Sequence, residues 1–169
     1  MPSVKPLLTS EQIRDRVTDL ADLVSRDYAG KELLAIGILK GAFIFFADLV
    51  RLIRVPVTVD FITASSYLKD SSSGKLQIYC DIREKVTDKH VLLIDDIIDT
   101  GISLDAIRNR LLSQNPASLR ICVLVDKKER RLVEVPVDYI GFEVPDVFIV
   151  GYGIDFDNHY RNLPYIAFL

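Results

Sequence analysis

Fully apolar runs alternate along this chain with segments whose apolar residues recur at helical spacing. Residues 33–39 and 91–94 are apolar at every position, which is typical of strands buried on both faces of a parallel sheet. Between residues 13 and 24, by contrast, apolar side chains return every three or four positions and predict a helix. The pattern indicates an α/β fold with a central, mostly parallel sheet flanked by helices.

Capping and breaking residues set the expected boundaries of these elements. Thr9 and Gln12 form a capping box that begins the first helix, and Gly30 ends that element. Pro56 stops a second helix, which is expected over 42–53. A third helix is expected over 103–112. Strands are expected over 33–39, 57–62, 76–80, 91–94, 119–125, 139–142 and 148–150.

Composition and charge exclude several classes of protein. The chain has 169 residues, of which 49% are hydrophobic and 27% charged, so we expect one domain over 1–169 that folds without disulfides. A net charge of −3 argues against nucleic-acid and membrane partners. The N-terminus is too polar for a secretory signal. Cys80 and Cys122 lack metal-ligand spacing, so we expect a cytoplasmic protein with two buried, reduced thiols.

A polar stretch over 63–75 interrupts the alternation of strands and helices. It is rich in serine and about a dozen residues long. Loops of that length inside a compact domain are often functional lids. We therefore expect a loop there that covers a ligand.

The stretch over 91–104 concentrates the groups that can do chemistry. A buried strand is expected to end at Asp95 and Asp96; Asp99 follows, and a turn with two hydroxyl side chains and a glycine leads into a helix. Ligands of open α/β sheets bind beyond the carboxyl ends of the strands, and a helix N-terminus with close backbone approach favours a phosphate. Three nearby carboxylates fit a sugar phosphate, because two can accept hydrogen bonds from vicinal hydroxyls and the third can act as a base.

A purely structural interpretation of this stretch is also available. Asp99 and Ser103 are residue types that cap helices. Capping accounts for one carboxylate but leaves the two at the strand end unexplained. The chain contains neither a Walker sequence nor a Gly-x-Gly-x-x-Gly fingerprint, so neither type of nucleotide site is expected.

This stretch resembles the phosphoribosyl-pyrophosphate (PRPP) signature of type I phosphoribosyltransferases: an apolar strand, two acids, two aliphatic residues, Asp-Thr-Gly and a hydroxyl residue. Further segments, in order, make nearly the whole chain similar to the hypoxanthine-guanine branch of that family; they lie at 39–41, 65–67, 125–127, 141–146, 150–155 and 160–165. The resemblance implies transfer of the 5-phosphoribosyl group from PRPP to N9 of hypoxanthine or guanine. The products would be IMP or GMP and pyrophosphate, in purine salvage.

The resemblance also implies roles for single residues at the sugar-phosphate site. Asp95 and Asp96 would hold the ribose hydroxyls, and Asp99 would be the general base at purine N7. The loop that would hold the 5′-phosphate consists of Thr100, Gly101, Ile102 and Ser103.

Around these, the family pattern implies pyrophosphate, purine, lid and metal positions. Pyrophosphate would be bound by Lys40, Gly41 and Arg161, and the family's loop peptide at Lys40–Gly41 is often cis. Lys127 would donate to the purine 6-oxo group, Phe148 would stack on the ring, and Ile149 would read its edge. Ser66 and Tyr67 would begin the lid. Asp155 would bind Mg²⁺, directly or through water, with Asp95 and Asp96 contributing indirectly.

Without the resemblance, several of these residues have ordinary interpretations. Lys40 would be a solvated lysine, Phe148 a core aromatic, and Lys127 part of a charged surface loop with Lys128, Arg130 and Arg131. The resemblance further implies a small hood built from about 127–169 with N-terminal residues. It also implies a homodimer or homotetramer, for which the apolar face over 42–53 offers an interface.

Two other classes of function stay open from the residues. A non-catalytic regulator on the same fold would keep the PRPP loop and bind nucleic acid, but would carry a basic face or an added segment. A phosphoacceptor receiver domain also uses an acidic pair at a strand end, although it places the pair near the start of its chain.

Overall fold

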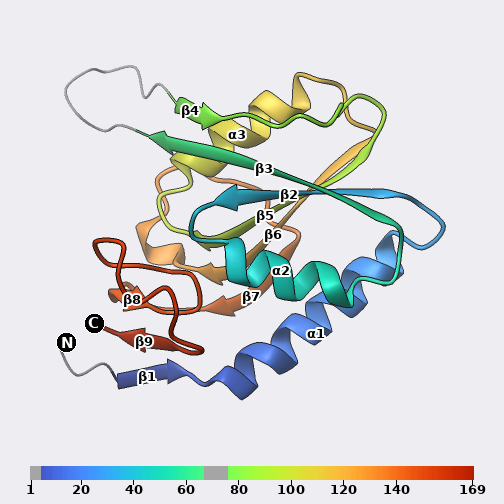
Figure 1. Ribbon diagram of the computed structural model, residues 1–169. Coiled ribbons are helices and arrows are strands. Elements are labelled where there is room, and N and C mark those ends of the chain that lie inside the picture. The colour runs from blue at the N-terminus through green and yellow to red at the C-terminus, as the bar shows by residue number, and fades with distance from the viewer. Residues whose placement is uncertain (1–4, 67–75) are drawn as a thin grey trace.

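A six-stranded sheet forms the centre of the molecule in the computed structural model, which describes residues 5–66 and 76–169 (Figure 1). The strand order is β4-β3-β2-β5-β6-β7, and neighbours are parallel except for the antiparallel edge strand β4. The strands are β2 (Leu33–Leu39), β3 (Val57–Ser66), β4 (Leu76–Cys80), β5 (His90–Ile98), β6 (Ser118–Asp126) and β7 (Tyr139–Glu143). The predicted fold class is confirmed.

Helices cover both faces of this sheet. α1 (Ser10–Asp27) and α2 (Phe43–Leu52) lie on one face and α3 (Ile102–Leu112) on the other, while η1 (Lys128–Arg130) is a short turn after β6. Alternate residues of β5 belong to the two cores: Leu92 packs in the cluster with α1 and α2, and Leu93 in the cluster with α3. The run over 91–94 is apolar throughout because each of its side chains is buried on one face or the other.

The first helix begins as its capping box predicts. The Thr9 side chain accepts from the Gln12 amide, and the Gln12 side chain accepts from the Thr9 amide at 2.8 Å. The helix ends at Asp27, and Gly30 lies beyond its end with φ of +75°. Arg16 fixes this helix to the sheet by donating to the carbonyls of Ile140 and Gly141 on β7.

A second, small antiparallel sheet lies beside the first. Its order is β1-β9-β8, with β1 (Lys5–Leu8), β9 (Ile166–Phe168) and β8 (Ile149–Val150). The pattern over 148–150 predicted β8, but β1 and β9 escaped prediction. Strands of three or four residues are too short for an alternation to stand out, and these two are stabilised by pairing across the whole length of the chain.

Two strands run further than their apolar patterns predict. β5 continues to Ile98 because β6 offers it partners as far as Asp126, so the expectation that it ends at Asp95 and Asp96 was wrong. β3 continues to Ser66 because β4 pairs with it, so residues 63–66 are strand rather than loop. The rest of the predicted lid, residues 67–75 with Tyr67, lies outside the described residues.

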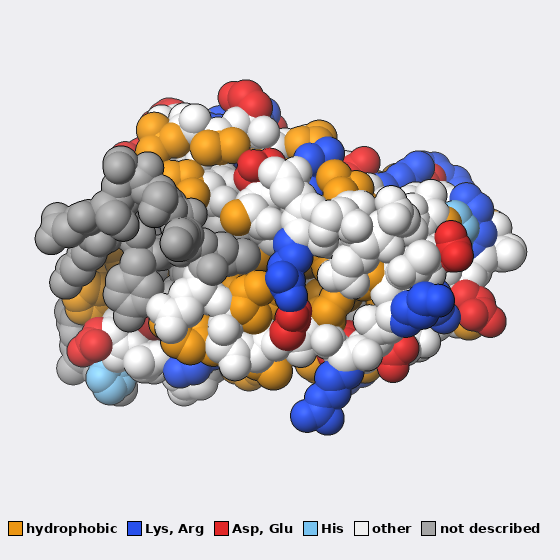
Figure 2. Space-filling view, turned by 90° about the horizontal axis from the view of Figure 1, so that it is seen from above, with side chains coloured by type: hydrophobic (Ala, Val, Ile, Leu, Met, Phe, Trp, Pro, Cys, Tyr) orange, Lys and Arg blue, Asp and Glu red, His pale blue; other side chains and the backbone are white. Residues whose placement is uncertain are grey.

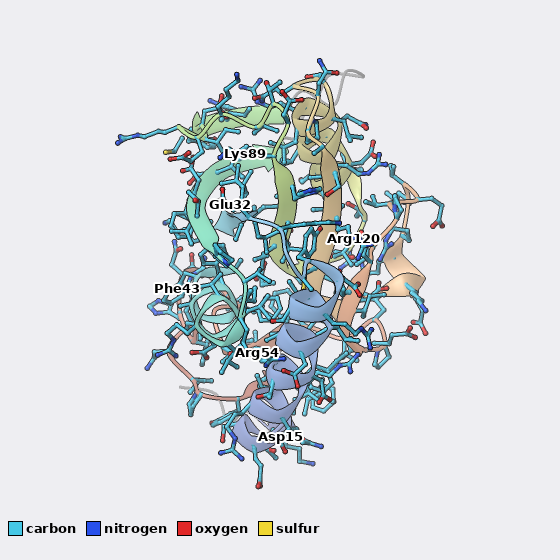
Figure 3. All side chains as sticks on the ribbon, turned by 90° about the vertical axis from the view of Figure 1, so that its right-hand side faces the viewer. Asp15, Glu32, Phe43, Arg54, Lys89 and Arg120 are labelled. Atoms are coloured by element: carbon cyan, nitrogen blue, oxygen red, sulfur yellow. The ribbon has the colours of Figure 1, made fainter. Side chains whose placement is uncertain are left out.

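The end of the sheet where the parallel strands begin faces the viewer in Figure 3, with Arg120 labelled. Charged and aromatic side chains form a closed network around this arginine. Arg120 of β6 donates to Asp27 and to the Tyr139 hydroxyl, both at 2.7 Å. The Tyr139 hydroxyl donates in turn to Asp27 at 2.8 Å. The rings of Tyr28 and Tyr139 lie 5.5 and 5.9 Å from the guanidinium carbon. This end of the sheet therefore pairs its charges internally.

The cysteines differ in their surroundings. Cys122 is buried in β6, as expected, whereas Cys80 is exposed because it ends the edge strand β4; the expectation of two buried thiols was wrong for Cys80. Among helices of the described residues, none is long and apolar enough to cross a membrane.

Candidate active site

The strands β2 and β5 separate at their carboxyl ends. Their pairing stops at Gly37 and Ile94, although β2 stays paired with β3 as far as Leu39. From β2 the chain moves outward to β3, whereas from β5 it moves the other way to β6. This is a topological switch point, the place where open α/β sheets bind ligands. The arrowheads of β2 and β3 in Figure 1 point to this end, on the left, where β8 also lies.

Two adjacent carboxylates lie on β5 beside this opening. Asp96 is buried, and Asp95 is half-buried with its Oδ1 accepting from the Asp96 amide at 3.0 Å. Burial and the neighbouring Asp96 carboxylate raise the pKa of Asp95 well above its usual range, and burial also raises the pKa of Asp96. Ionising both carboxyls is therefore unfavourable in the ligand-free protein, and hydroxyl donors or a cation bound here would stabilise the ionised form.

The loop after β5 turns sharply into α3 at Gly101. This glycine is the N-cap residue with φ of +84°, and no side chain caps the helix there. A Cβ at position 101 would lie 2.4 Å from the Val133 carbonyl oxygen, so only glycine fits. The interpretation of Asp99 and Ser103 as caps fails, because neither is the N-cap residue. The amides at the start of α3 and the positive end of its dipole lie at the sheet edge beside Asp95 and Asp96.

Asp99 and Lys127 lie across from one another at the ends of β5 and β6. The Lys127 amide donates to the Ile98 carbonyl at 3.0 Å, and its side chain is buried with 5% of the residue exposed. Burial lowers the pKa of Lys127, while the negative charge of Asp99 opposes that shift. Arg130 approaches the Asp99 carboxylate, with Nε 3.3 Å from Oδ1. A carboxylate and a buried ammonium donor thus share the edge of the site.

On the other side of the opening, the loop after β2 packs against Asp96. A Cβ on Gly41 would lie 2.0 Å from Oδ2 of Asp96, so this close approach requires glycine. Lys40 is exposed next to it. The cis peptide in this loop joins Leu39 to Lys40, one residue before the expected position.

The segment before the last strand brings two further predicted residues to the same place. Arg161 donates to the Gly153 carbonyl at 2.6 Å and forms an ion pair with Asp155, at 2.7 Å. A Cβ on Gly153 would lie 2.2 Å from the Gly41 carbonyl oxygen, so this segment touches the loop after β2. The positive charge of Arg161 also reaches Asp96, whose pKa it acts to lower.

Two of the predicted purine residues, Phe148 and Ile149, lie at the start of β8. Phe148 is 52% exposed, and its ring meets that of Phe156 edge-on with centroids 5.5 Å apart. The adjacent Ile149 is buried in β8. Phe148 therefore offers an aromatic face that the core does not use. Ser66 ends β3, and nothing further is described of the lid.

Arg131 was expected on the surface, and that expectation was wrong. Its side chain is 9% exposed and forms an ion pair with Asp126, which is 3% exposed. A run of charged residues after a strand gives no signal that one of them turns inward. The only clue in the sequence is that Asp126 directly follows the apolar run over 121–125, where a buried carboxylate needs a partner.

Charged side chains of both signs are scattered over the described part of the face that includes the β4 edge (Figure 2). Lys and Arg side chains are interspersed there with Asp and Glu, and hydrophobic side chains are exposed between them. That face is not the basic surface that a nucleic-acid-binding regulator would carry.

Comparison with known proteins places this geometry among purine phosphoribosyltransferases. Residues 3–157 match the phosphoribosyl transferase domain family. The chain is 45% identical to a hypoxanthine-guanine phosphoribosyltransferase of Dictyostelium discoideum, covering 95% of this chain and 92% of that protein. It is 47% identical to one of Aquifex aeolicus, with the same coverage. A crystal structure of a hypoxanthine-guanine phosphoribosyltransferase from Bacillus anthracis superimposes with a TM-score of 0.95 at 44% identity and 99% coverage of both chains.

Proposed function

The chain belongs to the hypoxanthine-guanine phosphoribosyltransferase family of purine-salvage enzymes, and we propose how its own residues divide the work of that reaction. The C1–O bond of PRPP to pyrophosphate breaks, and C1 bonds to N9 of hypoxanthine or guanine. A ring proton of the base leaves, and IMP or GMP forms. The observation that best supports this assignment is the grouping of Asp95, Asp96, Asp99 and Lys127 around one switch point.

The sugar phosphate is bound at the end of β5. The Asp95 and Asp96 carboxylates accept hydrogen bonds from the 2′ and 3′ hydroxyls, which offsets the desolvation that raises both pKa values. Their negative charge also stabilises the positive charge that develops on the ribose as pyrophosphate departs. The 5′-phosphate is held at the N-terminus of α3 by Thr100, Gly101, Ile102 and Ser103.

The base lies between β6 and the small sheet. The Lys127 ammonium donates to the 6-oxo group and disfavours adenine, which presents a donor at that position. Asp99 accepts the proton at N7, Phe148 stacks on the ring, and backbone groups of Ile149 read its edge. Proton transfer of this kind contributes about 10²–10⁴-fold to the rate.

The carboxylates fit Mg²⁺ that arrives with PRPP. No three acidic, histidine or cysteine side chains gather into a cluster in the described part of the chain. Mg²⁺ needs only one or two carboxylates when phosphate oxygens and water complete its shell. Asp155 would bind it directly or through water, and Asp95 and Asp96 would contribute indirectly. Bound Mg²⁺ would neutralise the charge of the leaving pyrophosphate.

The pyrophosphate is held from two sides. Lys40 and the backbone of Gly41 approach from the loop after β2, and Arg161 approaches from the opposite segment, exchanging its contact with Asp155 for phosphate oxygens. The small sheet β1-β9-β8, with residues from about 127 onward, acts as a hood over the base. Ser66 and Tyr67 begin the lid that excludes water from the reacting sugar.

A homodimer or homotetramer is favoured by an apolar groove beside α1 and α2. The groove, with a volume of about 770 Å³, lies between α1, α2 and the segment after Arg161. Leu52, which lines the groove, is 40% exposed, and Phe43 at the start of α2 is 45% exposed. Light scattering should give a particle of at least two chains, and Phe43→Asp should lower its mass; a wild-type monomer would contradict this assembly.

A cytoplasmic location is favoured by the free thiols of Cys80 and Cys122 and by the bacterial relatives.

The proposed function is tested by a spectrophotometric assay with Mg²⁺ and PRPP. Hypoxanthine, guanine, xanthine and adenine are supplied in separate cuvettes. We expect turnover with hypoxanthine and guanine and none with adenine. Efficient formation of AMP would overturn the assignment of Lys127. Absence of turnover with every base, while PRPP still binds, would overturn the catalytic proposal and favour a regulator.

A further inference from the structure

The segment 127–133 binds three successive carbonyls, those of residues 98–100, where β5 leads into the phosphate loop. The Lys127 amide donates to the Ile98 carbonyl at 3.0 Å. The Arg131 side chain donates through Nε to the Asp99 carbonyl at 3.1 Å. The amides of Leu132 and Val133 both donate to the Thr100 carbonyl, at 2.9 and 3.0 Å. Only the Arg131 contact uses a side chain, so it is the one link that substitution can remove.

The hydrogen bonds to these carbonyls also fix the direction of the N–H groups in the same peptides. In a planar trans peptide the C=O and N–H groups point in opposite directions. The carbonyls of residues 98, 99 and 100 point at the segment 127–133, so the amides of residues 99, 100 and 101 point away from it. The same contacts set the backbone from which the Asp99 side chain projects.

Two nitrogens of the Arg131 guanidinium bind two different acceptors. Nη2 forms an ion pair with Asp126, and Nε reaches the Asp99 carbonyl. The carbon stem packs against Gly101, where Cδ would lie 3.0 Å from an added Cβ. Lysine carries a single point charge on a flexible stem and cannot bind both acceptors in this fixed geometry. The Asp126–Arg131 pair therefore links the end of β6, next to Lys127, to the loop beyond β5.

We propose that Arg131, held by Asp126, is a positioning residue that sets the phosphate-binding amides and the Asp99 carboxylate for catalysis. The inference rests on the proposed function for its consequence in turnover, but the contact itself stands on the geometry above. Asp99 is thereby held from two sides, with Arg131 at its carbonyl and Arg130 at its carboxylate.

Arg131→Lys is the sharpest test because it keeps a positive charge beside Asp126 and removes the Nε donor. We expect kcat to fall by about 10- to 100-fold, as a displacement of catalytic groups by about 1 Å produces. The KM for PRPP should rise and the KM for hypoxanthine should stay unchanged. Amide hydrogen exchange, followed by mass spectrometry of peptides covering 98–103, should become faster.

A matched control removes a charge from the same segment without touching the loop. Lys128 forms an exposed ion pair with Glu143, so Lys128→Gln should keep wild-type kcat, KM and exchange. If Arg131→Lys does not fold, Asp126→Asn loosens the same guanidinium from its other end and should give the same pattern to a smaller degree.

The outcomes separate this inference from the proposed function. If the KM for PRPP and the exchange of 98–103 stay at wild-type values in Arg131→Lys, Arg131 has no positioning role, even where kcat is lower. Suppose that the wild-type enzyme is inactive with every base but Arg131→Lys still speeds exchange in 98–103. Arg131 then positions this segment as proposed, and the proposed function is wrong.

Discussion

The two ends of the parallel sheet carry charged side chains in opposite arrangements. Where the strands begin, Arg120 is paired with Asp27 and flanked by two tyrosine rings, so each charge has a partner. Where the strands end, Asp95 and Asp96 are adjacent acids, and burial lowers the pKa of Lys127. The charges of Arg120 and Asp27 are compensated within the protein, whereas Asp95, Asp96 and Lys127 would be compensated by a ligand. Unfavourable electrostatics confined to one edge is what a binding site produces.

Loss of a carboxylate at Asp99, compared with loss of one at Asp27, should give the largest difference in turnover between the two ends of the sheet. Asp99→Asn removes the proton acceptor but keeps the shape of the side chain, so turnover should fall by about 10²–10⁴-fold while Mg-PRPP binding is kept. Steady-state kinetics and calorimetric titration with PRPP measure the two effects. Asp27→Asn, at the opposite end, should keep wild-type turnover. Loss of PRPP binding in Asp99→Asn would make Asp99 a phosphate-loop residue instead.

Removal of the buried ammonium at Lys127 should reduce activity without weakening the fold. A hydrogen bond from a charged group contributes about 1.5–3 kcal/mol, so kcat/KM for hypoxanthine should fall roughly 10- to 100-fold in Lys127→Met. The melting temperature should not fall, because the variant no longer buries an ammonium. Lys128→Met, one position on, is the control and should leave kcat/KM unchanged. A Lys127→Met enzyme that still excludes adenine and uses hypoxanthine normally would refute the purine contact.

The acidic pair should destabilise the ligand-free fold at neutral pH. The folded-state pKa of Asp95 is raised, so its contribution to stability is fully present below about pH 3.9 and is lost as pH rises through the folded pKa. Asp95→Asn should therefore stabilise the ligand-free, metal-free protein by about 1 kcal/mol at pH 8 and have little effect at acidic pH. Urea unfolding at both pH values checks this. The same variant should bind IMP more weakly.

At the other end of the sheet, the contribution of Asp27 to stability should depend on pH in the opposite direction. The hydrogen bond from Tyr139, followed by Arg120, lowers the pKa of Asp27, so its stabilisation is present above about pH 3.9 and is lost as pH falls through the folded pKa. Asp27→Asn should destabilise the protein on the order of 1 kcal/mol at pH 7, a small effect because solvent screens the group. Near pH 2 wild type and variant should unfold alike. If Asp27→Asn and Asp95→Asn changed the free energy of unfolding by the same amount and in the same direction, the contrast between the two ends would be wrong.

Residues in contiguous motifs are easier to predict from the sequence than contacts between distant segments. The acids of β5, the Asp-Thr-Gly turn and Lys40–Gly41 stand in contiguous motifs, so the sequence alone is enough to predict them. The extension of β5 to Ile98 and the strands β1 and β9 could not be predicted, because they depend on pairing with distant segments. The inward turn of Arg131 could not be predicted either, since it follows a run of charged residues over 126–130 and only the fold brings Gly101 against it. Local chemistry is visible in sequence, whereas contacts between loops require the fold.

The division between a ligand-binding end and a self-paired end is tested most directly by amide hydrogen exchange with and without IMP and Mg²⁺. Nucleotide should protect the segments 95–103 and 127–133 and the amides of 148–155. It should leave the segments around Asp27, His90 and Arg120 unchanged. Protection that appears at the strand beginnings instead, or equally at both ends, would contradict the placement of the site.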